Sequence, residues 1–346
     1  MGAFIVERDW DGVSVGTDMP KMGLKVSSTT PVRFKDVKVP KANLIGEEGD
    51  GFKIAMNILN YGRLALGAVS AGLMNQSLRD MEKRAASRTQ FGVPIHDFEL
   101  IQEKMVRTAA HAFASRNITF FTANLLERDS LANVAIESSH TKLYGTDRCW
   151  DALYDALQIA GGAGYLRTLP YEKRMRDFRV TTIFEGTSEI HSIYPPLTLY
   201  RQYGSEVTKR GPVGKLLFLL RLSRSNPLKR LRAGHPKVDR ALEVAARSES
   251  MFRGLLRDGF MRYGKKIVER EFHLRRMTRL SLSLFWLVAS VASMRSRYDG
   301  HYPEDELALL EYLTEEAVAV QRKVSDEQQS RLERAHRRVF ASISRH

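Results

Sequence analysis

The sequence predicts a mainly α-helical fold with a short β-rich segment at its N-terminal end. Three observations predict it. Apolar residues recur every three or four positions from Ala55 onward, alternating patterns are confined to the first 45 residues, and glycine and proline signals separate the periodic segments. A length of 346 residues and a hydrophobic content of 43% suit two or three domains with ordinary cores.

Short strands are predicted in the first 45 residues, at 3–6, 13–15, 31–34 and 37–39, and the turn pair Asp11-Gly12 lies between the first two. So few strands cannot close a barrel or a sandwich, and they leave an open edge that proteins normally avoid. We therefore expect that a partner covers this edge or that the chain lacks the first part of a β domain.

Helical spacing begins after the loop 46–51. The first helix carries an apolar face formed by Ala55, Ile58, Leu59, Gly62, Leu66, Val69 and Leu73. Gly92-Val93-Pro94 interrupts the chain, and the same spacing then predicts a second helix through Phe98, Ile101, Met105, Ala109 and Ala112.

A third helix is predicted from about 134 to 159, because Gly161-Gly162 is a C-terminal stop signal. A fourth begins near Gly186 or Thr187. Beyond the proline-containing stretch 205–240, two or three long amphipathic helices fill the chain. The apolar stretch 280–294 is interrupted by serines and is shorter than the roughly 18 to 20 residues of a spanning helix, so we expect a buried core helix.

The net charge of +14 favours an anionic partner: nucleic acid, a membrane surface, or an acidic ligand such as a CoA phosphate. Residues 205–240 hold ten bases and two acids, which gives about +8 (10 minus 2). Large apolar residues lie among them, namely Leu216, Leu217, Phe218, Leu219, Leu220 and Leu222. This mixture favours a membrane-surface segment. Packing against the chain's own helices is the alternative, and no nucleic-acid motif accompanies the charge.

Cysteine and histidine usage gives little sign of further chemistry. Cys149 is the single cysteine, so no internal disulfide can form, which fits a reducing compartment or simply no need for a disulfide. We expect its side chain to be a small packed group on a helix. The nine histidines have no zinc-ligand spacing, so no metal is predicted.

The segment 157–190 carries the most specific motifs. It contains Gln158-Ile-Ala-Gly161-Gly162, then Arg174-Met-Arg176-Asp177, then Ile183-Phe-Glu185-Gly186-Thr187-Ser188-Glu189. This resembles the acyl-CoA dehydrogenase signature. Four further stretches agree in order and spacing: 21–40, 46–53, Asn60-Tyr-Gly-Arg63, and Arg88-Thr-Gln90-Phe91-Gly92 with Ile101-Gln102. Residues 262–269 and the helices after them resemble the C-terminal extension of the very-long-chain subgroup.

The resemblance implies a three-part organisation: a partial middle β domain over 1–45, a helical flavin and acyl-CoA domain over 46–204, and a basic linker with a helical C-terminal extension over 205–346. It also implies a C-terminal fragment, without the family's N-terminal helical domain and part of its β domain. The implied activity is α,β-dehydrogenation of a long-chain fatty acyl-CoA to a trans-2-enoyl-CoA in β-oxidation.

Glu185 is the catalytic base that the resemblance implies. It takes the Cα proton of the acyl thioester while a hydride passes from Cβ to N5 of FAD, and a carboxylate in a dry site suits such a weak carbon acid. The backbone N–H of Glu185 and a flavin hydroxyl would bind the thioester oxygen. The residue pattern alone also permits a carboxylate that merely favours a helix N-terminus.

FAD contacts are implied for Arg88, Gln90 and Phe91, which would touch the diphosphate side of a neighbouring subunit's flavin. They are implied also for Gln158, Gly161 and Gly162, where glycine permits close backbone approach, and for Thr187, Ser188 and Glu189 at a helix start. A loop arginine and a plain helix stop are the alternatives for the first two groups.

Asn60, Arg63 and Gly186 are the implied acyl-CoA contacts. Asn60 stands where many members have Asp, and Glu99 stands where many have a flavin-binding Gln. A surface helix arginine is the alternative for Arg63.

The implied partners are an acyl-CoA substrate, electron-transfer flavoprotein as electron acceptor, a second subunit in a homodimer, and a membrane surface. The implied location is the cytoplasm or the mitochondrial matrix, peripheral on the inner membrane. Two other functions remain open: a non-catalytic assembly paralogue of the same fold, which the presence of Glu185 disfavours, and an oxidase that passes electrons to O₂.

Overall fold

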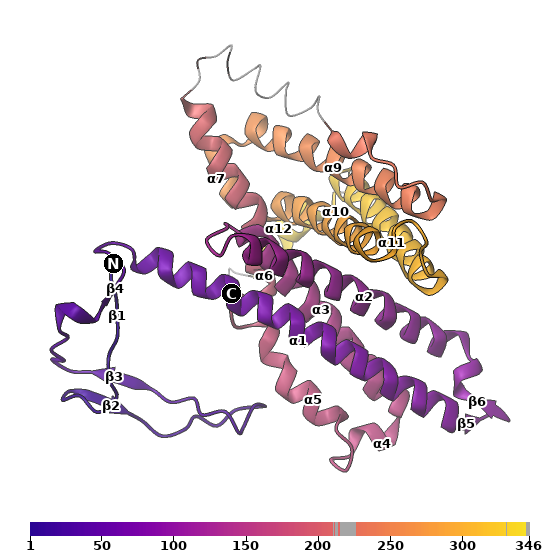
Figure 1. Ribbon diagram of the computed structural model, residues 1–346, viewed down its shortest axis with the longest axis horizontal. Coiled ribbons are helices and arrows are strands. Elements are labelled where there is room, and N and C mark those ends of the chain that lie inside the picture. The colour runs from indigo at the N-terminus through magenta and orange to yellow at the C-terminus, as the bar shows by residue number, and fades with distance from the viewer. Residues whose placement is uncertain (210, 212–213, 215–225, 330, 344–346) are drawn as a thin grey trace.

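A computed structural model describes residues 1–209, 211, 214, 226–329 and 331–343. Figure 1 shows a β-rich arm that projects from the N-terminal end of a long helix, followed by a helical bundle that includes the C-terminal end of the chain. The prediction of a mainly helical fold is confirmed.

The arm contains two separate antiparallel pairs. Strand β1 (Ala3–Phe4) pairs with β4 (Leu44–Ile45), and β2 (Val13–Val15) pairs with β3 (Val32–Phe34). A short 3-10 helix, η1 (Lys41–Asn43), precedes β4. The predicted strand at 37–39 is wrong, because the chain turns at Asp36, where φ is 51°, and leaves β3. The first strand is shorter than predicted, and β4 was not predicted.

The arm touches the helices at few points. The Leu24 amide donates a hydrogen bond to Asp177 at 2.7 Å, and the Gly51 amide donates to the Met1 carbonyl at 3.1 Å. Its apolar side chains remain largely exposed: Phe34 is 61% exposed and Phe4 49%. The described part of the chain thus leaves about half or more of each side chain uncovered, and a covering partner or a missing first part of the β domain stays a prediction.

Three long helices form the centre of the bundle: α1 (Gly51–Ser87), α2 (Glu99–Arg128) and α3 (Ala135–Ala160). The small pair β5 (Thr89–Gln90) and β6 (Val93–Pro94), with η2 (Ile95–Asp97), joins α1 to α2. Helix α1 crosses α3 closely at Gly67, where a Cβ would clash with the Thr141 side chain. Helix α3 ends at Gly161, where φ is 64°, as the glycine pair predicted.

Short elements follow: α4 (Gly162–Tyr165), α5 (Tyr171–Phe178), η3 (Arg179–Thr182) and α6 (Ser188–His191). The predicted fourth helix begins where expected but ends after one turn, and α7 (Tyr194–Thr208) follows. Pro195 and Pro196 explain the break, because proline lacks an amide donor and is tolerated only in a first turn.

The C-terminal part contains η4 (Pro227–Arg230), α9 (Pro236–Arg262), η5 (Gly264–Glu269), α10 (Glu271–Tyr298), α11 (Glu304–Gln329) and α12 (Leu332–Ile343). Three of the described helices here, α9, α10 and α11, are long, as predicted, and the shorter α12 follows them. Ala110 and Phe113 of α2 share one hydrophobic core with Trp286 and Leu287 of α10. The predicted domain boundaries remain predictions.

Helix α10 contains the apolar stretch 280–294. By length and composition it could cross a membrane, but 56% of its most apolar window is buried inside the protein. Leu280, Leu287 and Met294 are fully buried. A core helix therefore accounts for this stretch, and Cys149 is likewise buried in a hydrophobic cluster.

Only part of the basic segment can be described. Leu216, Leu217, Phe218, Leu219, Leu220 and Leu222 lie outside the described residues, as do Arg210, Lys215, Arg221 and Arg224. Lys229, Arg230 and Arg232 are exposed. Lys237 instead pairs with Glu311 at 3.1 Å, and Leu228 packs against the shared core.

Candidate active site

Glu185 lies in a tight turn between η3 and α6. Its φ is 58° and that of Gly186 is 97°, so two successive residues have left-handed backbone conformations. Glycine adopts such a conformation freely, but a glutamate pays a conformational cost there. Residues other than glycine in this region occur often at functional sites.

The Glu185 carboxylate lies directly over α1 at Gly62. A Cβ at position 62 would stand 2.9 Å from Glu185 Oε1 and 3.0 Å from Cδ. Oε2 is buried and has no hydrogen-bond partner among the described residues. The carboxylate therefore keeps an acceptor free, and the missing side chain at Gly62 makes the room for it.

Three buried side chains hold the backbone of this turn. Arg63 Nε and His191 Nε2 donate to the Glu185 carbonyl at 3.2 Å and 2.9 Å. Lys142 Nζ donates to the Gly186 carbonyl at 2.7 Å. Arg63 is 5% exposed, and Lys142 and His191 are fully buried. Donors from α1, α3 and α6 thus satisfy both carbonyls of the turn.

Burial lowers the pKa values of two of these donors, Lys142 and His191. It lowers the pKa of Lys142 to about 8, and the charge of Asp147 acts in the opposite direction. It also lowers the pKa of His191 to about 4, so this ring is neutral at physiological pH. The Ser139 hydroxyl lies 2.7 Å from His191 Nδ1 and completes the polar contacts of the ring.

The predicted acyl-CoA contacts gather around the turn, but two of them are buried. Asn60 is 7% exposed, and its Oδ1 accepts hydrogen bonds from Ser138 Oγ at 3.1 Å and from Arg63 at 3.4 Å. The Arg63 guanidinium also stacks over the Tyr194 ring at 5.4 Å. In this structure Arg63 holds the Glu185 turn, and its contact with CoA stays a prediction.

Thr187, Ser188 and Glu189 start α6 beside the turn. The Thr187 hydroxyl accepts from the Ile190 amide at 3.4 Å, and Ser188 Oγ donates to Asp147 at 2.7 Å. Glu189 is exposed. The side chains of Thr187 and Ser188 thus already have partners within the protein. The contact of these three residues with a cofactor stays a prediction.

The remaining predicted FAD contacts lie at the opposite end of α1. Arg88 follows α1 and is 26 residues beyond Gly62, which corresponds to about 39 Å along a helix. Gly161 and Gly162 lie at the end of α3, where Arg84 of α1 donates to the Ala160 carbonyl at 3.3 Å. The structure thus separates the predicted site into two groups. One group surrounds Glu185, and the other contains Arg88, Gln90, Phe91, Gln158, Gly161 and Gly162.

The second group suits an external anionic and planar ligand. Arg88 and Gln90 are exposed, and Phe91 is 94% exposed with a φ of 53°. Gly161 and Gly162 have open space where a Cβ would stand. An exposed cation, an aromatic ring and two bare glycines fit the diphosphate and rings of FAD.

Sequence reasoning missed Gly62, Ser139, Lys142 and His191. Ser138, Ser139, His140, Thr141 and Lys142 form a polar run on α3, which resembles a solvated face, yet all five are buried. A continuous polar run gives no periodic signal of burial. Gly62 was placed on an apolar face, where nothing indicates a carboxylate above it.

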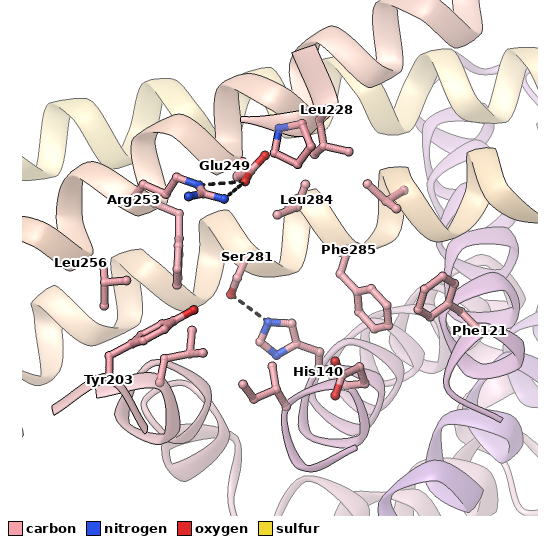
Figure 2. A pocket seen from close by; sticks show the side chains of 16 residues that line it. Phe121, His140, Tyr203, Leu228, Glu249, Arg253, Leu256, Ser281, Leu284 and Phe285 are labelled. Atoms are coloured by element: carbon pink, nitrogen blue, oxygen red, sulfur yellow. Dashed lines mark hydrogen bonds and ion pairs between the residues drawn. The ribbon is translucent and has the colours of Figure 1, made fainter. Parts of the chain in front are cut away.

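A separate cavity of about 440 Å³ lies where the C-terminal helices meet α3 and α7. Its walls are largely apolar and include Phe121, Phe252, Leu284 and Phe285. Figure 2 shows His140 of α3 and Ser281 of α10 joined across it, with Nε2 and Oγ 2.8 Å apart. Helix α3 thus contacts the Glu185 turn through Lys142, His191 of α6 through Ser139, and α10 through His140. Among the described residues, no group of His, Cys, Asp and Glu could hold a metal ion.

Comparison with known proteins agrees with this geometry. The family described as acyl-CoA dehydrogenase, C-terminal domain, matches residues 49–193. The chain is 30% identical to the very long-chain specific acyl-CoA dehydrogenase of Rattus norvegicus, over 99% of this chain and 55% of that protein. It is 40% identical to an acyl-CoA dehydrogenase of Bacillus subtilis, over 56% of this chain and 50% of that protein.

A crystal structure of acyl-CoA dehydrogenase complexed with FAD from Bacillus anthracis superposes with a TM-score of 0.81 and 28% identity. The match covers 94% of this chain and 58% of that one. The chain therefore spans about half the length of the curated relatives it matches. The family match, whose residues 49–193 include Gly62 and Glu185, and these relatives place the chain in the acyl-CoA dehydrogenase family.

Proposed function

We propose that this chain supplies the catalytic base of a flavin-dependent acyl-CoA dehydrogenase acting on long acyl chains. The observation that carries the proposal is the Glu185 carboxylate, held over Gly62 with Oε2 lacking any described protein partner. A free carboxylate acceptor can take the Cα proton of an acyl thioester. FAD, when bound, accepts the hydride that leaves Cβ.

The chain's own residues orient this base. Arg63 and His191 fix the Glu185 carbonyl, and Lys142 fixes the Gly186 carbonyl, so the turn cannot rotate without breaking buried hydrogen bonds. Fixed geometry of this kind is a large part of catalytic power, because misplacement by about 1 Å can cost about 100-fold in rate.

The product of the reaction tests the proposal against its alternatives. Palmitoyl-CoA is incubated with the FAD-loaded enzyme and purified electron-transfer flavoprotein, and the thioester is followed by mass spectrometry. We expect more than one equivalent of trans-2-enoyl-CoA per flavin, two hydrogens lighter than the substrate, to form only when the flavoprotein acceptor is present. Product formation with O₂ alone, accompanied by hydrogen peroxide, would identify an oxidase. Absence of product with acyl-CoAs of all lengths would favour the assembly paralogue.

Several finer assignments belong to this proposal. The acyl chain is long, because the relatives that match nearly the whole chain are named very long-chain specific. Electron-transfer flavoprotein is the electron acceptor, and the active unit is at least a dimer. The location is the mitochondrial matrix or a bacterial cytoplasm, since both mitochondrial and bacterial relatives match.

A membrane surface is the proposed docking partner of the basic segment. Lys229, Arg230 and Arg232 are exposed, and each base near an anionic surface contributes about 1 kcal/mol, which salt screens. Flotation with phosphatidylserine vesicles should show binding that weakens as salt rises and is lost when these three residues become Glu. Reversing Arg33, Lys35 and Lys38 on the arm is the charge-matched control. Equal flotation of both variants and the wild type would contradict the proposal.

A further inference from the structure

The backbone of the Glu185 turn needs support from its surroundings. A glutamate with a φ of 58° is less stable by itself than in the ordinary helical or extended conformations. The next residue, Gly186, has a φ of 97° and supplies no side chain to brace the turn. The bracing must come from the groups that surround the two carbonyls.

A chain of two hydrogen bonds provides one brace. Ser139 Oγ lies 2.7 Å from His191 Nδ1, and His191 Nε2 lies 2.9 Å from the Glu185 carbonyl oxygen. A carbonyl can only accept, so Nε2 carries the proton, and Nδ1 of the neutral ring accepts from the Ser139 hydroxyl. Ser139 and His191 are both fully buried, so the bond between them is shielded from water, while the bond to the Glu185 carbonyl is part-buried.

The histidine and the glycine fit one another. A Cβ at position 186 would stand 2.8 Å from His191 Nε2, which is closer than Cβ atoms approach a ring nitrogen. Position 186 therefore needs glycine for two reasons: its φ is positive, and a Cβ there would clash with the His191 ring. This observation ties His191 to the same two residues that set the direction of the carboxylate.

Resting on the proposed function, we propose that His191, held in one tautomer by Ser139, is a positioning residue that fixes the Glu185 backbone and so aims its carboxylate at the substrate. Arg63 donates to the same carbonyl at 3.2 Å, so removing His191 leaves the turn with one of its two donors there. We therefore expect that a variant without His191 stays folded but holds the Glu185 carboxylate in the wrong orientation.

The first experiment reads the tautomer in the 346-residue chain without turnover. Nitrogen-15 NMR of the histidine-labelled chain is recorded from pH 7.5 to 5.5, and the His191 signal is identified by its loss in His191→Gln. We expect a neutral ring protonated at Nε2 throughout, and mixed tautomers in Ser139→Ala. A charged ring at pH 6, or a ring protonated at Nδ1, would overturn the inference.

The second experiment separates aim from binding in the FAD-loaded enzyme. His191→Met should slow flavin reduction by palmitoyl-CoA roughly tenfold or more, the worth of one buried hydrogen bond or above, with substrate affinity nearly unchanged. His191→Gln, whose amide can donate to the same carbonyl, should recover most of the rate. A purely structural role would lower FAD content and substrate affinity together.

The two experiments distinguish this inference from the proposed function. A His191→Met enzyme that reduces flavin at the wild-type rate overturns the positioning role and leaves Glu185 as the base. A Glu185→Gln enzyme with full activity would show that Glu185 is not the base. The positioning role of His191 would then fall with it, because that role is to orient Glu185.

Discussion

At the scale of single residues, a missing side chain determines where the proposed base lies. The Glu185 carboxylate occupies the space beside Gly62 that a Cβ would fill, and buried donors fix its backbone. Glycine inside a helix normally weakens it by about 1 kcal/mol relative to alanine. The chain therefore keeps a locally unfavourable residue at the point where the carboxylate must approach α1.

Alanine at position 62 should separate activity from stability. A Cβ there stands 2.9 Å from Glu185 Oε1, so Gly62→Ala should push the carboxylate aside and lower turnover roughly 100-fold. The melting temperature should fall little, because alanine favours a helix. Gly72→Ala on the same helix is the matched control, since nothing lies within 4 Å of its Cβ. Equal turnover in both variants would refute the contact.

Buried histidines should make the protein sensitive to acid. Burial lowers the pKa of His140 to about 3 and that of His191 to about 4, against 6.5 for a free ring. Between pH 6.5 and these lower values, the unfolded chain binds more protons than the folded chain. The contribution of each neutral ring to the free energy of unfolding is therefore fully present above pH 6.5 and is lost as the pH falls toward 4. At pH 5 each ring should cost about 2 kcal/mol of unfolding free energy.

Urea unfolding at pH 7 and pH 5 measures this loss. The wild type should lose stability between the two values, and His191→Gln should lose less, because glutamine does not titrate. Identical losses in both proteins would show that His191 is not buried and neutral.

At the scale of elements, α3 connects the parts of the molecule. One turn of this helix carries Ser139 and Lys142 toward the Glu185 turn and His140 toward Ser281 of α10. The C-terminal helices share a core with α2 through Trp286 and Leu287. The Glu185 turn and the C-terminal helices are therefore braced by the same helix.

The sequence predicted the long helices well because their signals are local. Periodic apolar residues mark α1 and α2, and the Gly161-Gly162 pair marks the end of α3. The strands were predicted less well, since β1 pairs with β4 about 40 residues away and local alternation cannot reveal such a partner. Lys142 was missed because it belongs to a run of consecutive polar residues. Such a run shows no alternation of polar and apolar positions that would indicate burial.

The site residues named from motifs divide in the same way. Glu185 and Gly186 could be proposed from the sequence because their family signature is contiguous, and their roles stay a prediction. The support from Arg63, Lys142 and His191 depends on three helices meeting, which only the fold displays. The separation of Arg88 from Glu185 likewise follows from the length of α1 and not from any motif.

At the scale of the whole molecule, the two groups of predicted FAD contacts are too far apart for one compact site. About 39 Å of helix separates Gly62 from Arg88. A flavin bound beside Glu185 therefore cannot also contact Arg88 and its neighbours within the same chain. The proposed dimer accounts for this separation if a neighbouring subunit's flavin meets Arg88, Phe91 and Gly161.

Arg88→Ala should weaken FAD retention in the assembled enzyme, because a guanidinium suits a diphosphate by charge and geometry. The flavin content after gel filtration and the oligomeric state by sedimentation measure this effect. Lys323→Ala, an exposed cation on α11, is the control and should retain FAD fully. A fully active monomer, or equal FAD content in both variants, would contradict the shared site.

The most direct test of the central claim is single-turnover flavin reduction by palmitoyl-CoA in Glu185→Gln, followed anaerobically by loss of the flavin absorbance. The amide keeps the shape of the side chain but cannot accept the Cα proton. Substrate affinity should therefore persist while reduction slows about 1,000-fold or more, at least roughly 4 kcal/mol of barrier. Glu243→Gln, which changes an exposed carboxylate on α9 outside both groups of predicted contacts, should reduce its flavin normally. A Glu185→Gln enzyme whose flavin is reduced at the wild-type rate would contradict the assignment of the base.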